Sequence, residues 1–286
     1  MYDIVGFEVR ETEVVESFDE VHSDGEPIPV RMAYDTARIA PFAPTIVWDG
    51  SSDGDGDGVN WHDPLNWDLD RTPNSSDDVF IDAPEIFGDS ITPQHDSAVI
   101  QITTNVSIRS MQNLGNVHLA SGSLAISQDS VTEQFQWTNG TLNVADLTNT
   151  GLFTVSGTAN RSLIGTFNNV GHMQLREANL FLNSATFENL SGGLFEFESG
   201  RLSATGGFFN FNHRAGATFR KITGAQAIVE VNFTDQDGSL FEVQQGRLDF
   251  IRTSNFNGTD FNVAAGGRVL IYNPSHNFSG HLTDFG

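Results

Sequence analysis

Glycine and phenylalanine recur together in the second half of this sequence, and this repeat constrains the fold more than any other feature. The pattern Gly-x-x-Phe-x4-Gly starts at Gly192, Gly216, Gly238 and Gly258, and its phenylalanines are 24, 22 and 20 residues apart. A second column of phenylalanines precedes the first and comprises Phe167, Phe187, Phe211, Phe233 and Phe256. Two columns that recur with similar spacing over several units predict a repeat architecture.

Apolar and polar residues alternate within each unit, as they do in β-strands. In residues 238–250, Phe241 and Val243 point to one face and Glu242 to the other, and the alternation resumes after Gly246. A repeat of about 22 residues without helix signals favours an all-β fold, a right-handed parallel β-helix (β-solenoid) with coils of about 20–24 residues. The leucine-rich repeat signature is missing, and propeller blades need about 40 residues.

The register of the repeat divides its side chains into an inward and an outward set. We expect one stacked interior column of Phe195, Phe219, Phe241 and Phe261. The outward column beside it reads Glu196, Arg220, Glu242 and Asn262, so opposite charges fall on adjacent coils. Asparagine recurs where the coils turn, and we expect side-chain ladders at Asn168, Asn189, Asn212, Asn232 and Asn257.

Composition divides the sequence into three zones. Residues 1–47 contain short alternating patterns and end in a proline-rich stretch, which indicates an N-terminal β arm or the tail of a preceding domain. Residues 48–98 are rich in Asp, Gly and Pro and hold three of the four tryptophans, which is typical of an acidic cap. Residues 99–286 contain the repeats and are predicted to form the solenoid.

Charge and composition exclude several classes of function. The net charge is −23, and residues 1–100 hold 23 acidic residues against 4 arginines. Nucleic acids and anionic membranes both require a positive footprint, so neither is an expected partner. No apolar run approaches the roughly 18 residues of a membrane helix, and cysteine is absent. The acidic N-terminus lacks a signal-peptide pattern, which fits a cytoplasmic protein or a fragment of a longer secreted chain.

The sharpest local motif is a run of aspartates at alternate positions in the second zone. Asp53, Asp55 and Asp57 are each followed by glycine, and Asn60 and Asp63 come soon after. Calcium takes about six to eight oxygen ligands, and this spacing bends carboxylates around one point. The sequence therefore predicts a structural Ca²⁺ site at these five residues. The alternative is an acidic turn without metal, because an EF-hand has Glu at its twelfth position and this loop has proline.

The same zone contains a tryptophan motif. Its residues are Trp48, Trp61-x-Asp63-Pro64-x-Asn66-Trp67, Pro73 and Asp77-Asp78-Val79-x-Ile81. The motif resembles a segment at the start of β-solenoids in large bacterial secreted and surface proteins, the adhesin- and passenger-type parallel β-helices. The resemblance implies an extracellular or cell-surface location within a longer chain. Trp61 and Trp67 are expected to cover the open end of the first coil; the alternative is that they stack on sugar rings.

The sequence contains none of the common catalytic motifs, and its eight histidines are scattered. Parallel β-helices also include polysaccharide lyases and glycoside hydrolases, for which the candidates here are Lys221, Arg220, Asp235 and Asp237. Lys221 takes an inward position in the repeat register. Either it is buried there with a lowered pKa, or a one-residue bulge brings Ile222 inward instead; the bulge is the favoured interpretation.

These observations favour a role other than catalysis. We expect a structural or adhesive module of a larger secreted or surface bacterial protein, stabilised by calcium, with a carbohydrate or another cell-surface ligand as its candidate partner. The alternative is a carbohydrate-active β-helix enzyme. A long acidic groove with clustered carboxylates would favour the enzyme, and a smooth face of Thr, Asn and Ser would favour the structural role.

Removal of calcium is expected to lower the melting temperature. Without a cation, three carboxylates in one short turn repel one another and loosen the cap. A ligand that binds only the folded state adds roughly 2.7 kcal/mol at 100 times its Kd. Thermal melts in EDTA and in Ca²⁺, followed by calorimetric titration, measure this effect. Identical melts without any heat of binding would contradict the prediction.

Overall fold

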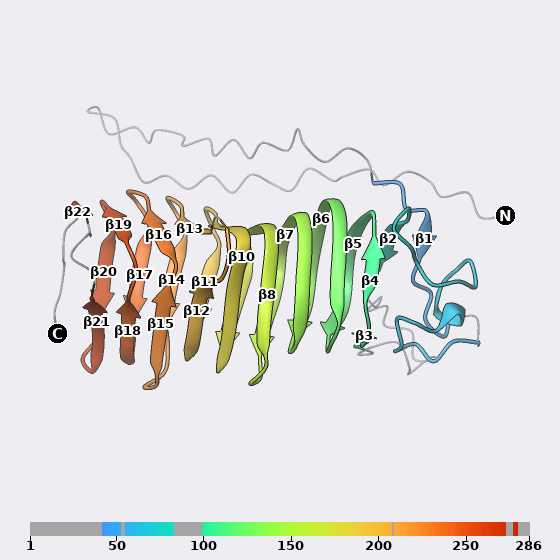
Figure 1. The fold of residues 1–286 in the computed structure, drawn as a ribbon, viewed down its shortest axis with the longest axis horizontal. Helices are drawn as coiled ribbons and strands as arrows, with labels where there is room; N and C mark the ends of the chain where they lie inside the picture. Colours follow the sequence, from blue (N-terminus) through green and yellow to red (C-terminus); the bar gives the residue numbers. More distant parts are fainter. Residues whose placement is uncertain (1–41, 53–54, 83–98, 208, 273–276, 280–286) are drawn as a thin grey trace, which may run out of the picture. The chain divides into compact units, whose positions relative to one another are not determined.

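The computed structural model describes residues 42–52, 55–82, 99–207, 209–272 and 277–279. The described residues from Ala43 onward belong to one compact unit. These residues form an all-β, parallel β-solenoid of about eight turns, which confirms the predicted fold class. Figure 1 shows its strands side by side from β2 to β22. No helix in these ranges is long and apolar enough to cross a membrane.

Each coil contributes strand segments to three parallel stacks, which we call stacks A, B and C. Stack A contains β1 (Ile46–Val47), β2 (Asp78–Ile81), β5 (Ser110–Leu119), β6 (Ser123–Trp137), β7 (Gly140–Ser156), β8 (Asn160–Asn169), β10 (Ala178–Asn189), β13 (Asn210–His213), β16 (Asn232–Asp235), β19 (Ser254–Asn257) and β22 (Asn277–Ser279). Stack B contains β3 (Ile100–Ile102), β5, β6, β7, β9 (His172–Arg176), β11 (Leu194–Phe197), β14 (Thr218–Lys221), β17 (Leu240–Val243) and β20 (Asp260–Val263). Stack C contains β4 (Val106–Ile108), β6, β7, β8, β10, β12 (Gly200–Ala204), β15 (Gln226–Glu230), β18 (Gly246–Phe250) and β21 (Gly267–Ile271).

Long strands in the first coils belong to more than one stack because they continue through a corner. β6 and β7 pair along all three stacks, with irregularities in register where they bend. The predicted arm and cap each contribute a strand to stack A, since β1 pairs with β2 and β2 pairs with β5. The parallel pairing therefore begins before the repeats that are visible in the sequence.

Glycines of the repeat lie at turns that require a left-handed backbone. The first glycines of the four units, Gly192, Gly216, Gly238 and Gly258, have φ values of 82°, 75°, 81° and 71°. Residues with a Cβ avoid this conformation, whereas glycine adopts it without strain. The glycine column therefore marks one corner of each coil.

The predicted interior column of phenylalanines is confirmed. Phe195, Phe219, Phe241 and Phe261 occupy equivalent positions on successive coils of stack B and are at most 3% exposed. Their ring centroids are 5.0, 4.9 and 5.1 Å apart. These distances match the spacing of about 4.8 Å between parallel strands, so each ring contacts the next.

The second phenylalanine column runs along stack A. Phe167, Phe187, Phe211 and Phe233 pair in register, with ring centroids 5.1, 4.6 and 5.0 Å apart. Phe195 of the first column meets Phe187 and Phe211 edge to face. Phe256 is buried beside Phe233, but the register pairs Phe233 with Ser254. The predicted column is therefore in register from Phe167 to Phe233, but Phe256 is shifted by two residues from the position that pairs with Phe233.

A ladder of buried polar side chains, here called the buried ladder, accompanies this column. Its members are Asn113, Thr132, Asn149, Asn169, Asn189, His213 and Asp235, which pair on successive coils and are at most 2% exposed. Asn149 Nδ2 donates to Asn169 Oδ1 over 2.8 Å, and Asn169 Nδ2 donates to Asn189 Oδ1 over 2.7 Å. The three amides also donate to backbone carbonyls, namely those of Gly151, Leu194 and Thr218. These bonds give partners to the buried Nδ2 groups of the three amides, whose burial would otherwise destabilise the fold.

The buried ladder corrects the asparagine positions expected from the sequence. Asn189 is a member, whereas Asn168, Asn212, Asn232 and Asn257 are half-buried or exposed. Asn168 and Asn212 directly precede the ladder positions Asn169 and His213, so they point to the opposite face of the strand. The expectation of a ladder is confirmed, but of the five asparagines expected in it only Asn189 belongs to it.

The neutral form is favoured by burial at both titratable members of the buried ladder, His213 and Asp235. His213 Nδ1 accepts a hydrogen bond from Asn189 Nδ2 (3.1 Å), and its Nε2 donates to the carbonyl of Leu240 (3.3 Å), which fits a neutral ring. Burial lowers the pKa of His213 to about 4. Burial also raises the pKa of Asp235 to about 7, with a smaller contribution from the nearby Asp237.

Truncation of an interior phenylalanine is expected to cost far more than truncation of its outward neighbour. Phe241→Ala should lower the free energy of unfolding by about 3–5 kcal/mol because it leaves a cavity between two rings. Glu242→Ala should lower it by about 1 kcal/mol or less, since its ion pair is partly exposed. Urea denaturation of both variants measures the difference, and equal costs would show that the inward and outward sets are misassigned.

The two titratable ladder members are expected to give opposite pH dependences of stability. His213 takes up a proton on unfolding in acid, so stability is lost as the pH falls from about 6.5 through about 4. Asp235 releases a proton on unfolding, so stability is lost as the pH rises from about 3.8 through about 7. Replacement of either residue by Asn removes its titration and keeps a polar side chain in the ladder.

Melting temperatures at about pH 4.5 and about pH 7.5 test this expectation, since the unfolded-state pKa of His213, 6.5, and the folded-state pKa of Asp235, about 7, both lie between these two values. Relative to the wild-type protein, His213→Asn should gain more at the lower pH and Asp235→Asn more at the higher pH. All other charges are shared by the three proteins, so the difference isolates the two side chains. Shifts that do not depend on pH would contradict the assignment of buried neutral groups.

Candidate functional site

The acidic loop of residues 55–66 folds around the fully buried side chain of Asn66. Asn66 Oδ1 accepts a hydrogen bond from the backbone of Gly58 (2.8 Å), and its Nδ2 donates to Asp57 Oδ1 (2.8 Å) and to the carbonyl of Asn60 (2.9 Å). A Cβ on Gly56 would lie 2.1 Å from Asn66 Oδ1. Glycine at this position of the motif therefore allows the backbone to approach the amide closely.

The predicted calcium ligands lie on the outer side of this loop, and Asp53 is outside the described residues. Asp55, Asp57 and Asn60 are exposed, whereas Asp63 is half-buried. Asp63 caps the short 3-10 helix η2 (Pro64–Asn66) by accepting a hydrogen bond from the backbone of Leu65 over 3.0 Å.

Asp57 serves as a local cap in this loop. Its Oδ1 accepts hydrogen bonds from the backbone N–H groups of Asn60 and Val59, each 2.8 Å long. These bonds, together with the one from Asn66, lower the pKa of Asp57. Within the described ranges, no three His, Asp or Glu side chains form a group that could hold a metal ion. Calcium binding by residues 53–63 stays a prediction.

Three tryptophans pack against one another in the predicted cap. Trp67 meets Trp48 and Trp61 edge to face, with centroids 4.9 and 4.8 Å apart, and its Nε1 donates to the carbonyl of Trp61 over 2.9 Å. Trp61 and Trp67 are 1% and 0% exposed and share a hydrophobic cluster with Val79 of β2. They extend the core at the end where β1 and β2 lie (Figure 1), and neither offers an exposed ring to a sugar.

Asp77 and Asp78, at the C-terminal end of the tryptophan motif, form ion pairs within the predicted cap and with the first coils. Arg71 donates two hydrogen bonds of 2.7 Å to the carboxylate of Asp77, and this contact holds the pKa of Asp77 below its usual range. Asp78 in β2 forms an ion pair with Arg109. The motif therefore consists of structural residues in the part of the chain that the structure describes.

Lys221 is fully buried, and the bulge that we favoured from the sequence is wrong. Residues of β14 pair with those of β11 and β17 without a shift, so Lys221 stands in register with Phe197 and Val243. Its Nζ donates to the carbonyl of Glu198 (2.8 Å) and to the carbonyl and hydroxyl oxygens of Thr223. Burial lowers the pKa of Lys221 to about 8. The long side chain reaches the corner carbonyls, so the ladder needs no bulge to accommodate it.

The other candidates for lyase or hydrolase chemistry do not assemble a surface site with Lys221. Arg220 is the preceding residue of the same strand and faces outward, where it pairs with Glu242 at 2.5 Å. Asp235 is 2% exposed within the buried ladder, whereas Asp237 is exposed in the turn after β16. A polysaccharide on the surface would therefore not reach Lys221 or Asp235.

The predicted outward column on stack B is confirmed as a row of paired charges. Glu196, Arg220 and Glu242 stand in register on successive coils, followed by Asn262. Arg220 lies 2.5 Å from Glu242 and 4.0 Å from Glu196, and Gln174 also donates to Glu196 over 3.1 Å. Each carboxylate thus has a partner on a neighbouring coil, which is the arrangement of a structural ion-pair row.

The outer face of stack A from β7 to β19 is dominated by Asn and Thr. Its outward residues are Thr148, Thr166, Asn168, Thr186, Asn210, Asn212, Asn232, Thr234 and Asn255, with Asp146 and Glu188 among them. Asn168 donates to Asp146, and Asn212 donates to Glu188, each over 2.6 Å. This face is therefore rich in Thr and Asn, with two acidic residues that are bonded to asparagines.

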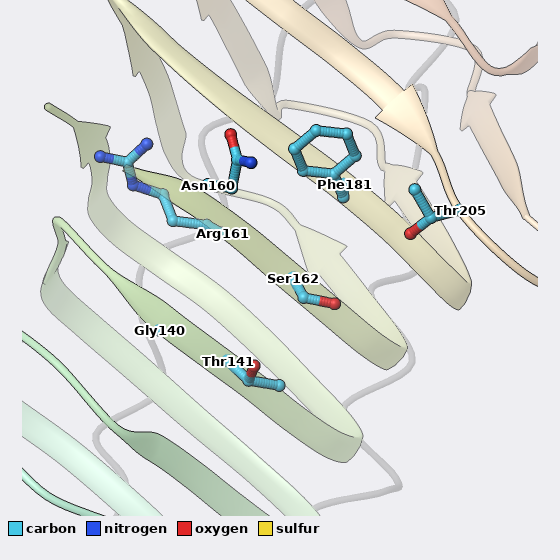
Figure 2. A pocket seen from close by; sticks show the side chains of 7 residues that line it. All are labelled: Gly140, Thr141, Asn160, Arg161, Ser162, Phe181 and Thr205. Atoms are coloured by element: carbon cyan, nitrogen blue, oxygen red, sulfur yellow. The ribbon is translucent and has the colours of Figure 1, made fainter. Parts of the chain in front are cut away.

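A pocket of about 360 Å³ opens on the outer side of stack C. Figure 2 shows its lining residues, which come from β7, β8 and β10 and from the end of β12: Gly140, Thr141, Asn160, Arg161, Ser162, Phe181 and Thr205. Phe181 is half-buried and faces outward between the buried residues Leu180 and Leu182. All the other described phenylalanines in strands β5 to β21 are buried. The pocket therefore surrounds an aromatic ring in an unusual position.

Sequence reasoning missed this pocket. Leu180, Phe181 and Leu182 form an apolar run in which strand alternation must send one large side chain outward. This apolar run could have indicated an exposed aromatic ring, because the repeat otherwise places its phenylalanines at inward positions.

No protein-family model matches the chain, and no curated protein and no solved structure is significantly similar to it. The parallel β-solenoid itself is established by the structure.

Proposed function

We propose that this chain is a structural and adhesive β-solenoid module of a larger secreted or surface bacterial protein. The observation that carries the proposal is the continuous stacking of about eight turns. Two phenylalanine columns and the buried ladder join each coil to the next. At about 4.8 Å per coil, such a body spans roughly 40 Å and resists bending, because all three stacks would have to deform together.

The outer surface supports this role. Stack A presents Asn and Thr side chains, and stack B presents a row of charges that are paired between coils. Neither face gathers unpaired carboxylates of the kind that hydrolysis of a glycosidic bond requires. The carbohydrate-active enzyme has less support, since two of its four candidate residues are buried.

The extracellular location and the calcium site rest on the tryptophan motif and on the aspartate loop. Both belong to the cap, and Trp61 and Trp67 cover core residues there. Calcium at residues 53–63 would neutralise adjacent carboxylates and hold this cap closed.

Distance measurements between spin labels test whether the module is rigid. The chain has no cysteine, so Ala43→Cys and Tyr272→Cys provide two exposed labelling sites near the ends of the described solenoid. Electron–electron resonance should give one narrow distance distribution, and the distribution should broaden in EDTA if calcium closes the cap.

A second pair at Thr150→Cys and Tyr272→Cys serves as the control. Both of its sites lie on the repeats, so its distance should be shorter and should not respond to EDTA. A broad distribution for both pairs in the presence of calcium would overturn the proposal of a rigid spacer.

A further inference from the structure

We propose that the pocket beside Phe181 binds one ring of a neutral glycan. The inference rests on the adhesive part of the proposed function and names its ligand class and its site. Three observations support it: the outward position of the Phe181 ring, the polar side chains around it that form no hydrogen bonds, and the lack of acidic residues in the lining.

The ring of Phe181 has open space beside it because its neighbours in register are small. Ser162 of β8 and Ser203 of β12 stand opposite Phe181 on the adjacent coils. In the two interior columns, by contrast, phenylalanines such as Phe187 and Phe219 are covered by another ring about one strand spacing away. The space over Ser162 is therefore left for another flat group to contact Phe181.

One face of a sugar ring, on which several C–H groups lie close to a common plane, is a surface of the required kind. The face of an aromatic ring carries partial negative charge and attracts the partly positive C–H groups of a saturated ring. The pocket is a shallow, open depression of about 360 Å³, which has room for one sugar ring. Because it opens on the outer face of the stack, the sugar can remain part of a longer glycan.

Four polar side chains around the pocket are available to hydroxyl groups. Thr141 and Ser162 lie on neighbouring strands, and Asn160 and Thr205 complete the lining (Figure 2). None of these four side chains forms a hydrogen bond to another of the residues that the structure describes. Hydroxyls and amides both donate and accept, which suits a ligand whose hydroxyls do the same.

The charges at the pocket favour a neutral ligand. The lining contains no carboxylate and no ammonium group, and its one charged side chain is Arg161. That guanidinium is fully buried and donates to backbone carbonyls, those of Trp137, Thr138, Ser156 and Ala159. The net charge of −23 repels polyanions, so an acidic glycan would find neither a free cation nor a favourable field.

Glycan binding by the 286-residue chain tests the proposal. The protein is screened on an array of neutral and acidic glycans, and cellohexaose, mannohexaose, maltohexaose and hexagalacturonate are then titrated by calorimetry. At least one neutral hexasaccharide should bind, and hexagalacturonate should not. Phe181→Ala should weaken that binding about tenfold or more, since it removes the stacking surface.

Two further variants keep the test independent of folding. Phe181→Trp retains an aromatic face and should retain binding, and Tyr272→Ala removes an exposed aromatic ring outside the pocket and should leave binding unchanged. The failure of all neutral glycans to bind at millimolar concentration would overturn the proposal, as would unchanged binding by Phe181→Ala. Either result is separate from the distance measurements, which report on the spacer role alone.

Discussion

The spacing of about 4.8 Å between parallel strands is the constraint on which the rest of this structure depends. Aromatic rings that stand side by side at this separation are already in contact, as the centroid distance of 4.9 Å between Phe219 and Phe241 shows. Amide side chains at the same separation are within hydrogen-bond distance, as in Asn169 and Asn189. One backbone repeat thus suits both apolar and polar columns, provided that each column keeps an apolar or a polar side chain from coil to coil.

This dependence explains what the sequence could predict. The inward phenylalanines and the outward Glu196, Arg220 and Glu242 follow from strand alternation, which holds within a straight segment. Corners interrupt the alternation, as the irregular register between Leu182 and Ala185 shows. A ladder of asparagines was expected, but at Asn168 and Asn212 the buried position belongs to the next residue in the strand. Lys221 followed the alternation, but the hydrogen bonds that satisfy its ammonium come from a corner and could not be read from the repeat.

The candidate sites differ in the same way. The aspartate motif was visible as a pattern, but the role of Asn66 as the centre of its loop depends on contacts between residues several positions apart. In the sequence, Phe181 is recognisable only as a break in the alternation of apolar and polar residues. That one face of its ring is open follows only from the pairing, which places Ser162 and Ser203 beside it. Local patterns therefore identified the elements, whereas the pairing between coils decided which side chains remain accessible.

The amides of the buried ladder also share one direction. Asn149 donates to Asn169, Asn169 to Asn189, and Asn189 to His213, which in turn donates to the carbonyl of Leu240. Every donor in this run points toward the C-terminal coils, so the side-chain dipoles add and polarise one another. Rotation of one amide by half a turn would place donor against donor and acceptor against acceptor. The orientation of the amides from Asn149 to Asn189 is therefore set collectively, and this run of side chains carries a dipole along the axis of the solenoid.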